Sequence, residues 1–280
     1  MSDADDNKLI EAILASGVKI PPMPAALLDV LALERDDDAG PLEYAVAIER
    51  DPALSGAVFR VAGSPVMGLR SKPESLDKAI TVLGLRTTVA VVRSEGLRGA
   101  LHDPALEAVM NTLWQRMNDV ADLVLATIRK TRMRGLREDL AFQAGIFHDC
   151  GVAVLCRRDP TYAQAIASAT VWPDLARLDA AHNTSHAVVG LMVARNWQLP
   201  PDVAQTVRQH HDRHPESLPE MVRAFSVLIQ FACHLLAQRT GGDDSEWENV
   251  WKVHAAALFR NAGPGWELPE LEDEFLTLMP

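Results

Sequence analysis

Four histidines and one aspartate in the second half of the chain are of the types that bind divalent metal ions. His148 and Asp149 are adjacent, His186 stands alone, and His210 and His211 are again adjacent. An imidazole and a carboxylate can bind one cation together, because divalent transition metals accept both kinds of ligand. Histidines on later helices could complete such a site from the far wall of a bundle. A plainer interpretation is that Asp149 caps a helix and His148 is a structural residue.

One more histidine has a spacing that could bind a metal. His182 lies four residues before His186, so the two would share one face of a helix, as zinc ligands often do. A single histidine on a helix is more often a hydrogen-bonded structural residue. We therefore expect His182 to help start its helix and not to bind a metal.

Helices are the elements expected to position these side chains. The hydrophobic residues, 48% of the chain, are mostly Ala, Leu and Val, and Ala and Leu are strong helix formers. Apolar residues recur at helical spacing, and no convincing strand pattern appears. Asp51 is predicted to cap a helix that Pro52 opens, and Trp247 and Trp251 are predicted to pack a C-terminal helix onto the bundle. Long helices are predicted over residues 106–134, 138–147, 160–168, 182–198, 201–211 and 221–239.

The overall composition excludes several classes of protein. The net charge is -11, and an acidic surface repels phosphate backbones, so the folded body is not expected to bind nucleic acid. The three cysteines lack close spacing, which argues against a disulfide framework, and Cys150 and Cys156 are predicted to be buried, unreactive thiols. Residues 1–8 lack the features of a signal peptide, and no apolar run approaches the roughly 20 residues of a membrane helix. We expect a soluble, cytoplasmic protein.

The order of motifs in the second half resembles that of a known superfamily. Residues 142–151 read FQAGIFHDCG and are similar to the His-Asp motif of the HD-superfamily metal-dependent phosphohydrolases. Residues 186–190 (HAVVG), 197–203 (WQLPPDV) and the pair at 210–211 follow in the order found in that superfamily. The resemblance implies that these segments surround one pocket.

Motifs in the first half narrow the resemblance. They lie at residues 20–24 (IPPMP), 51–54 (DPAL), 62–65 (AGSP) and 79–85 (AITVLGL), and they resemble the HDOD domain, the HD-related output domain of bacterial signalling proteins. The similarity spans residues 17–239. It implies an all-α, two-lobed protein with an N-terminal lobe over residues 1–105, an HD-like bundle over 106–240 and a helical extension over 241–280.

Two departures from the superfamily pattern bear on function. In catalytic HD enzymes, a further metal-binding histidine lies one long helix before the His-Asp pair, and a last aspartate completes the metal ligands. At the corresponding positions this sequence has Arg116, or Met117 one residue on, and Cys233. An arginine cannot be neutralised at ordinary pH, so it is an unfavourable metal neighbour and could instead pair with Asp149 in the cation's place. A site that loses its metal cannot lower the pKa of a bound water, and we therefore expect no hydrolysis.

The expected function is that of a non-catalytic signalling output protein with a degenerate metal site. A separate sensor domain is not expected in the remaining residues, so the signal is expected to arrive through a protein partner or a ligand. A homodimer stays open. The alternatives are a metal-dependent phosphohydrolase acting on nucleotides or cyclic nucleotides, and a small-molecule sensor. No cofactor is expected, although a divalent metal ion stays open. The residues expected around the pocket are Arg116, His148, Asp149, His186, His210, His211 and Cys233, and the potential metal ligands among them are the aspartate and the four histidines.

Overall fold

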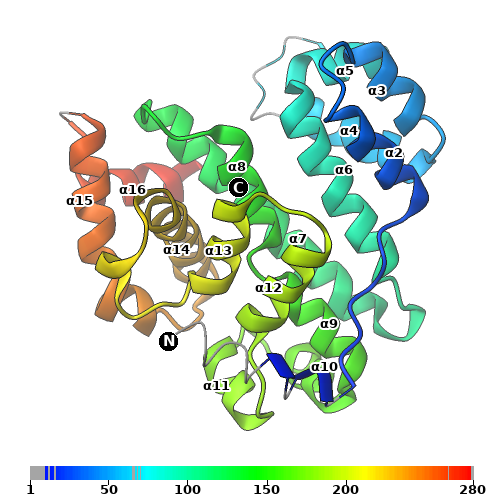
Figure 1. Cartoon of the computed structure of the whole chain (residues 1–280). Coiled ribbons are helices and arrows are strands. Elements are labelled where there is room, and N and C mark those ends of the chain that lie inside the picture. Colours follow the sequence, from blue (N-terminus) through cyan, green and yellow to red (C-terminus); the bar gives the residue numbers. More distant parts are fainter. Residues whose placement is uncertain are drawn as a thin grey trace. The chain divides into compact units, whose positions relative to one another are not determined.

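The computed structural model describes residues 10–278 except positions 12, 16, 65, 66, 68, 70 and 264. The elements in these residues are helices and no strand occurs among them, which confirms the all-α prediction (Figure 1). Contacts divide the chain into a smaller unit, Pro21–His102, and a larger unit made of Met1–Ile20 and Asp103–Pro280. The described residues among 10–20, which were expected in the first lobe, are thus grouped with the larger unit. Residues 1–8 and Pro65 of the AGSP motif lie outside the described residues.

The smaller unit is built from helices, one of which begins at its predicted capping residue. Asp51 accepts hydrogen bonds from the amides of Ala53 and Leu54, and Pro52 is the first residue of the helix, as predicted. Gly84 has a φ of 78° and joins two helices with almost no loop between them. Its helices are α2 (Ala25–Leu33), α3 (Pro41–Ile48), α4 (Pro52–Ala62), α5 (Leu76–Leu83) and α6 (Leu85–Ala100).

The larger unit carries the residues that could do chemistry. Its long helix α14 contacts α7, α8 and α13 and also the C-terminal elements η4, α15 and α16 (Figure 1). The elements in chain order are η2 (Pro104–Leu106), α7 (Glu107–Thr131), α8 (Glu138–Phe147), α9 (Cys150–Arg158), α10 (Pro160–Ala167), α11 (Leu175–Ala181), α12 (His186–Asn196), α13 (Pro201–Gln209), η3 (Pro215–Ser217), α14 (Glu220–Thr240), η4 (Trp247–Trp251), α15 (Lys252–Ala262) and α16 (Leu268–Leu278).

The predicted helix over residues 182–198 is wrong at its N-terminal end. His182 does not start a helix but follows the last residue of α11. Asn183 has a φ of 50°, a left-handed conformation that interrupts a right-handed helix. Ser185 then caps α12 by accepting a hydrogen bond from the Val188 amide. The new helix therefore begins at His186, which is held at a helix start beside a tight turn.

The C-terminal residues add more structure than the sequence predicted. The predicted packing of Trp247 and Trp251 is confirmed, since their side chains are 2% and 0% exposed, but the residues between them form a π-helical turn. The helix α16 after Gly265 was not predicted. The described residues from 241 onward are grouped with the larger unit.

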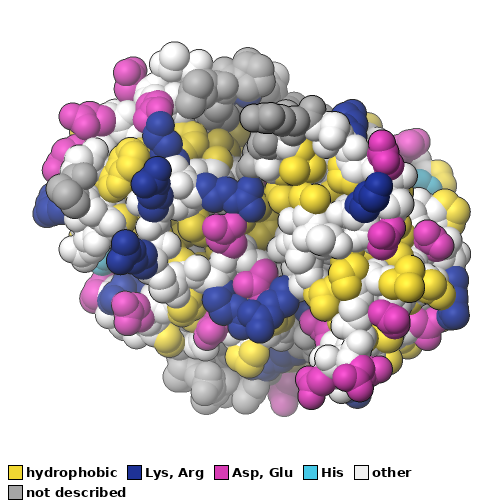
Figure 2. All heavy atoms as spheres, turned by 90° about the horizontal axis from the view of Figure 1, so that it is seen from above, with side chains coloured by type: hydrophobic (Ala, Val, Ile, Leu, Met, Phe, Trp, Pro, Cys, Tyr) yellow, Lys and Arg dark blue, Asp and Glu magenta, His cyan; other side chains and the backbone are white. Residues whose placement is uncertain are grey.

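Two helical stretches in the described residues are long and apolar enough to cross a membrane by length and composition. They are Glu138–Arg158 and Glu220–Thr240, and 94% and 78% of their apolar windows are buried inside the structure. Burial in the core explains their hydrophobicity, as it does for the central helices of soluble proteins. On the face drawn in Figure 2, acidic and basic side chains are interspersed, so the net negative charge does not form one patch there.

Candidate metal centre

Helix ends bring the predicted residues together in the larger unit. His148 follows the last residue of α8, and Asp149 immediately precedes α9. His186 opens α12, and His210 follows the last residue of α13, with His211 next to it. Helix ends suit a binding site because the chain can change direction there and aim successive side chains at one point. All five residues lie around one space, although 63 positions separate the first from the last.

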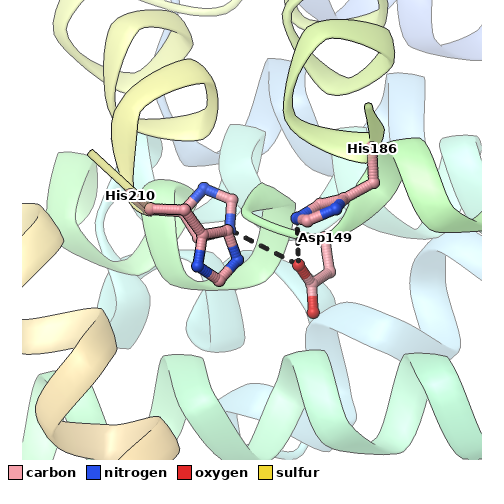
Figure 3. A group of neighbouring side chains, drawn as sticks. Asp149, His186 and His210 are labelled. Carbon is pink, nitrogen blue, oxygen red and sulfur yellow. Dashed lines mark ion pairs between the residues drawn. The ribbon is translucent and has the colours of Figure 1, made fainter. Parts of the chain in front are cut away.

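Asp149 is the centre of the arrangement. Its Oδ1 lies 3.5 Å from Nε2 of His186 and 3.5 Å from Nε2 of His210, and Figure 3 shows both rings facing it. Its Oδ2 lies 3.1 Å from Nε2 of His148. Asp149 makes no hydrogen bond that caps α9, so the interpretation of Asp149 as a simple helix cap is wrong. The two carboxylate oxygens therefore face different histidines.

Two glycines allow the helices to approach closely enough to build this geometry. A Cβ atom at Gly151 would lie 2.0 Å from the carbonyl oxygen of His186, so α9 and α12 touch backbone to backbone. A Cβ at Gly145 would lie 2.8 Å from Cα of Ala121, where α8 crosses α7. Only glycine tolerates such contacts without a backbone shift. The closeness of α9 and α12 places Asp149 beside His186.

Hydrogen bonds to Nδ1 orient the four imidazole rings. Nδ1–H of His148 donates to the carbonyl of Gly145 at 2.7 Å, and that of His210 donates to the carbonyl of Val207 at 2.9 Å. Carbonyl and carboxylate oxygens only accept hydrogen bonds, so each Nδ1 must carry the proton. In a neutral ring such as that of His210, the second nitrogen, Nε2, is then unprotonated, which is the tautomer that binds metals.

Carboxylates hold the other two rings. Nδ1–H of His186 donates to Oδ2 of Asp179 at 2.7 Å, and Tyr162 donates its hydroxyl proton to the other oxygen of Asp179 at 2.8 Å. Nδ1–H of His211 donates to Oε2 of Glu246 at 2.6 Å. Carboxylate–histidine pairs of this kind support metal ligands in proteins. The sequence did not identify Asp179, Tyr162 or Glu246, because no local pattern marks their partners.

Charges within the pocket are strongly coupled. Burial would raise the pKa of Asp149, but His148 and its other histidine neighbours hold it well below its usual value, so the carboxylate is ionised. Burial would lower the pKa of His148, but the Asp149 charge outweighs it and raises this pKa to about 10. Burial, together with His211, lowers the pKa of His210 to about 3. His210 is therefore neutral, which is the form that binds metals.

The residues present fit a bound metal ion. Asp149, His186, His210 and His211 each offer a ligand atom, and these atoms all lie within 4.8 Å of one another. Oδ1 of Asp149 and Nε2 of His186 and His210 are buried and have no hydrogen-bond partner. Leaving buried polar atoms unpaired costs about 1–3 kcal/mol each, so a cation among them would relieve that cost. His148 contacts the other oxygen of Asp149 and is not in this group of four.

Arg116 and Cys233 line the same cavity, which has a volume of about 250 Å³. No ion pair joins Arg116 to Asp149 in the described residues, so the pairing considered from the sequence does not form. The guanidinium of Arg116 lies instead 4.8 Å from the centre of the Trp172 ring. The cavity is therefore lined both by a cation of the protein and by Asp149, His210 and His211 of the potential metal ligands.

Other predicted residues have structural partners. His182 contacts Asp159, with its Nδ1 2.8 Å from the carboxylate, and lies outside the cluster. Cys150 and Cys156 are 0% and 1% exposed, and burial raises the pKa of Cys156 to about 12. Both are thus unreactive thiols, as predicted.

Comparison with known proteins places the chain in a family. The profile of the HDOD domain family matches residues 20–213. An uncharacterised protein of Treponema pallidum (strain Nichols) is 24% identical over 215 residues, which are 75% of this chain and 40% of that protein. The chain thus spans less than half the length of this curated relative.

Solved structures share the fold. An HDOD domain protein of unknown function from Geobacter sulfurreducens superposes with a TM-score of 0.70 at 20% identity, covering 99% of this chain and 95% of that one. A provisionally assigned signal transduction protein from Marinobacter aquaeolei VT8 gives 0.63 at 17% identity, covering 98% and 65%. A provisionally assigned metal-dependent phosphohydrolase from Shewanella amazonensis SB2B gives 0.62 at 18% identity, covering 92% and 96%. At these identities the likeness shows the fold alone.

Proposed function

The chain belongs to the HDOD domain family, and from that premise we propose that it is a regulatory signalling protein whose pocket holds one divalent metal ion without hydrolytic turnover. The ion's ligands are Asp149, His186, His210 and His211. Output through a protein partner and a cytoplasmic location are parts of the same proposal. A ligand set rich in imidazole favours a transition metal such as Zn²⁺ over Mg²⁺ or Ca²⁺.

One observation carries the metal proposal. Asp149, His186 and His210 present buried, unpartnered atoms to one point, while Nδ1 of each imidazole is already used. A shared ligand at this point would account for three buried atoms that face one another without a hydrogen bond. Bound at this point, a metal ion would supply Lewis acidity or a structural link between α9, α12 and α13.

Arg116 and Cys233 support the absence of turnover. They occupy the positions at which the superfamily pattern has two further ligands, and neither belongs to the group of four. Two-metal hydrolysis needs a second cation about 3.5–4 Å from the first. The Arg116 guanidinium lines the cavity and opposes a second cation there by its permanent charge.

Metal analysis tests the proposal directly. Protein stripped with a chelator and dialysed against Zn²⁺ or Co²⁺ should retain one ion per chain, and His210→Gln should retain none. His214→Gln is the matched control, because His214 is an exposed histidine outside the cluster. At a free metal concentration of 100 times Kd, the ion should stabilise the wild-type fold by about 2.7 kcal/mol. A wild-type protein that retains no metal and shows no stabilisation would contradict the proposal.

A metal-dependent phosphohydrolase is the second candidate, and the oriented Nε2 atoms favour it. The loaded protein would then hydrolyse a phosphodiester such as bis-p-nitrophenyl phosphate or a cyclic nucleotide, and Asp149→Asn would abolish the activity. Turnover of this kind would replace the non-catalytic proposal.

Ligand sensing is the third candidate. It is favoured by the cavity of about 250 Å³ and by the guanidinium of Arg116 within it. Nucleotides would then raise the melting temperature of the wild-type protein but not that of Arg116→Ala. Equal shifts in both proteins would remove Arg116 from the binding site.

A further inference from the structure

The C-terminal segment Gly242–Trp251 forms part of the wall of the metal pocket. It lies beyond residues 20–213, which the HDOD profile matches, yet Gly242, Glu246 and Trp247 line the same cavity as Asp149. The segment follows the end of α14 at Gly241, whose φ of 73° reverses the chain direction. This reversal brings the π-helical turn η4 back along α14. π-Helical turns are rare and are often found at functional sites.

Contacts with α14 hold this segment in place. The Trp247 ring is stacked on the ring of His234, with centroids 4.5 Å apart and an angle of 14° between the planes. Asp244 accepts a hydrogen bond from Nδ1–H of His234 at 2.8 Å. Trp251 is fully buried. Because these contacts flank Glu246 on both sides, the backbone position of Glu246 is well determined.

Both carboxylate oxygens of Glu246 are engaged. Oε1 accepts hydrogen bonds from Nε1–H of Trp251 at 2.9 Å and from the amide of Gln230 at 3.4 Å. Oε2 accepts from Nδ1–H of His211 at 2.6 Å. The donors on Oε1 prevent the carboxylate from rotating away, so Oε2 stays directed at His211. That hydrogen bond keeps the proton on Nδ1 and leaves Nε2 of His211 free for the cluster.

We infer that Glu246 is a positioning residue of the metal site and that segment Gly242–Trp251 is therefore a functional part of it. This inference rests on the proposed metal function. Glu246 does not bind the ion but selects the tautomer of His211 that can. His211, the fourth proposed ligand, is thus oriented by a residue that lies 35 positions further along the sequence.

The substitution Glu246→Gln reverses the hydrogen bond at His211. A glutamine has one acceptor oxygen, and the two donors from Trp251 and Gln230 will hold that oxygen in the place of Oε1. The glutamine amide must then donate to Nδ1 of His211, because its nitrogen has only donor protons. The histidine proton moves to Nε2, where it blocks metal binding. The conservative variant Glu246→Asp keeps two acceptor oxygens and with them the wild-type tautomer.

Metal titration is the first readout. We expect Glu246→Gln to weaken Co²⁺ binding by about 10–100-fold and to change the visible spectrum of bound Co²⁺. Glu248→Gln makes the same chemical change two residues away, at a side chain that is 52% exposed and pairs with Lys252, and should bind Co²⁺ as the wild type does. Wild-type affinity and spectrum in Glu246→Gln would overturn the inference.

Tautomer measurement on the metal-free protein is the second readout. Long-range ¹H–¹⁵N spectra should show the Nδ1–H form of His211 in the wild type and in Glu246→Asp, and the Nε2–H form in Glu246→Gln. An unchanged Nδ1–H form in Glu246→Gln would overturn the positioning role. If the wild type binds no Co²⁺, the metal function fails, and this spectrum still decides whether Glu246 orients His211. Should Glu246→Gln not fold, a loss of the Nδ1–H form in Trp251→Phe would support the role, and its retention would overturn it.

Discussion

Two histidine–carboxylate pairs support the cluster, and they are built differently. His186 and Asp179 are seven residues apart, and their side chains are 2% and 9% exposed. His211 and Glu246 are 35 residues apart, and their side chains are 29% and 32% exposed. The first pair is a local turn buried in the core. The second is a long-range contact that depends on the C-terminal segment. A carboxylate that orients a histidine ring can thus come from a nearby turn of the chain or from the C-terminal segment.

The two histidine–carboxylate pairs should differ in how strongly they contribute to the stability of the fold. Asp179 receives hydrogen bonds from the Tyr162 hydroxyl and from both the backbone amide and Nδ1 of His186. Glu246 receives its hydrogen bonds near the cavity, where water competes more effectively. We therefore expect the buried pair to be needed for both stability and metal affinity, and the C-terminal pair mainly for metal affinity.

The largest effect is expected from breaking the contact between α9 and α12, which lies beside the buried pair of His186 and Asp179. Gly151→Ala would place a methyl group 2.0 Å from the His186 carbonyl, so α9 and α12 must separate. We expect a loss of about 4 kcal/mol or more in the free energy of unfolding, measured by urea denaturation. Gly56→Ala is the control, because nothing lies within 4 Å of the position that its added methyl group would take, and Ala favours a helix by about 1 kcal/mol. Equal stability of the two variants would refute a tight crossing.

Asp179→Asn should have the next largest effect, and it distinguishes the two histidine–carboxylate pairs most clearly. The amide cannot accept all the hydrogen bonds that the carboxylate accepts, and each buried donor left unpaired costs about 1–3 kcal/mol. Both the unfolding free energy and the Co²⁺ affinity should fall, the affinity by about 10–100-fold. Glu246→Gln should lower the affinity with a smaller loss of stability. A comparable loss of stability in both variants would show that the two pairs contribute equally to the free energy of unfolding.

The smallest effect concerns the pH dependence of the metal-free protein. The folded-state pKa of His148 is about 10, above its unfolded value of about 6.5, so its pairing with Asp149 stabilises the fold fully below pH 6.5. This contribution is lost as the pH rises through about 10. We expect the difference in unfolding free energy between wild type and His148→Gln to shrink between pH 7 and 10. A constant difference over this range would contradict the pairing, and His214→Gln should show no such trend.

Local patterns singled out residues that the structure brings into one cluster. His148-Asp149 and His210-His211 are adjacent pairs, so one helix end positions both members of each pair. Cap and proline signals predicted the start of α4, and apolar periodicity predicted α8 with its observed bounds. The boundary before His186 was missed, although Asn183 is of a residue type that often adopts the left-handed conformation and Ser185 is of a type that caps helices. The predicted approach of Arg116 to Asp149 does not occur, and the guanidinium lies over the Trp172 ring instead.

The sequence by itself determined that the chain is helical, that it resembles the HDOD domain, and which side chains could bind a metal. Those properties depend on residue type and short spacing. Only the tertiary structure decided which oxygen of Asp149 faces which histidine, and that Asp179 and Glu246 orient two of the rings. A tautomer depends on the partner of the opposite ring nitrogen, and that partner is brought near by folding, not by its place in the chain.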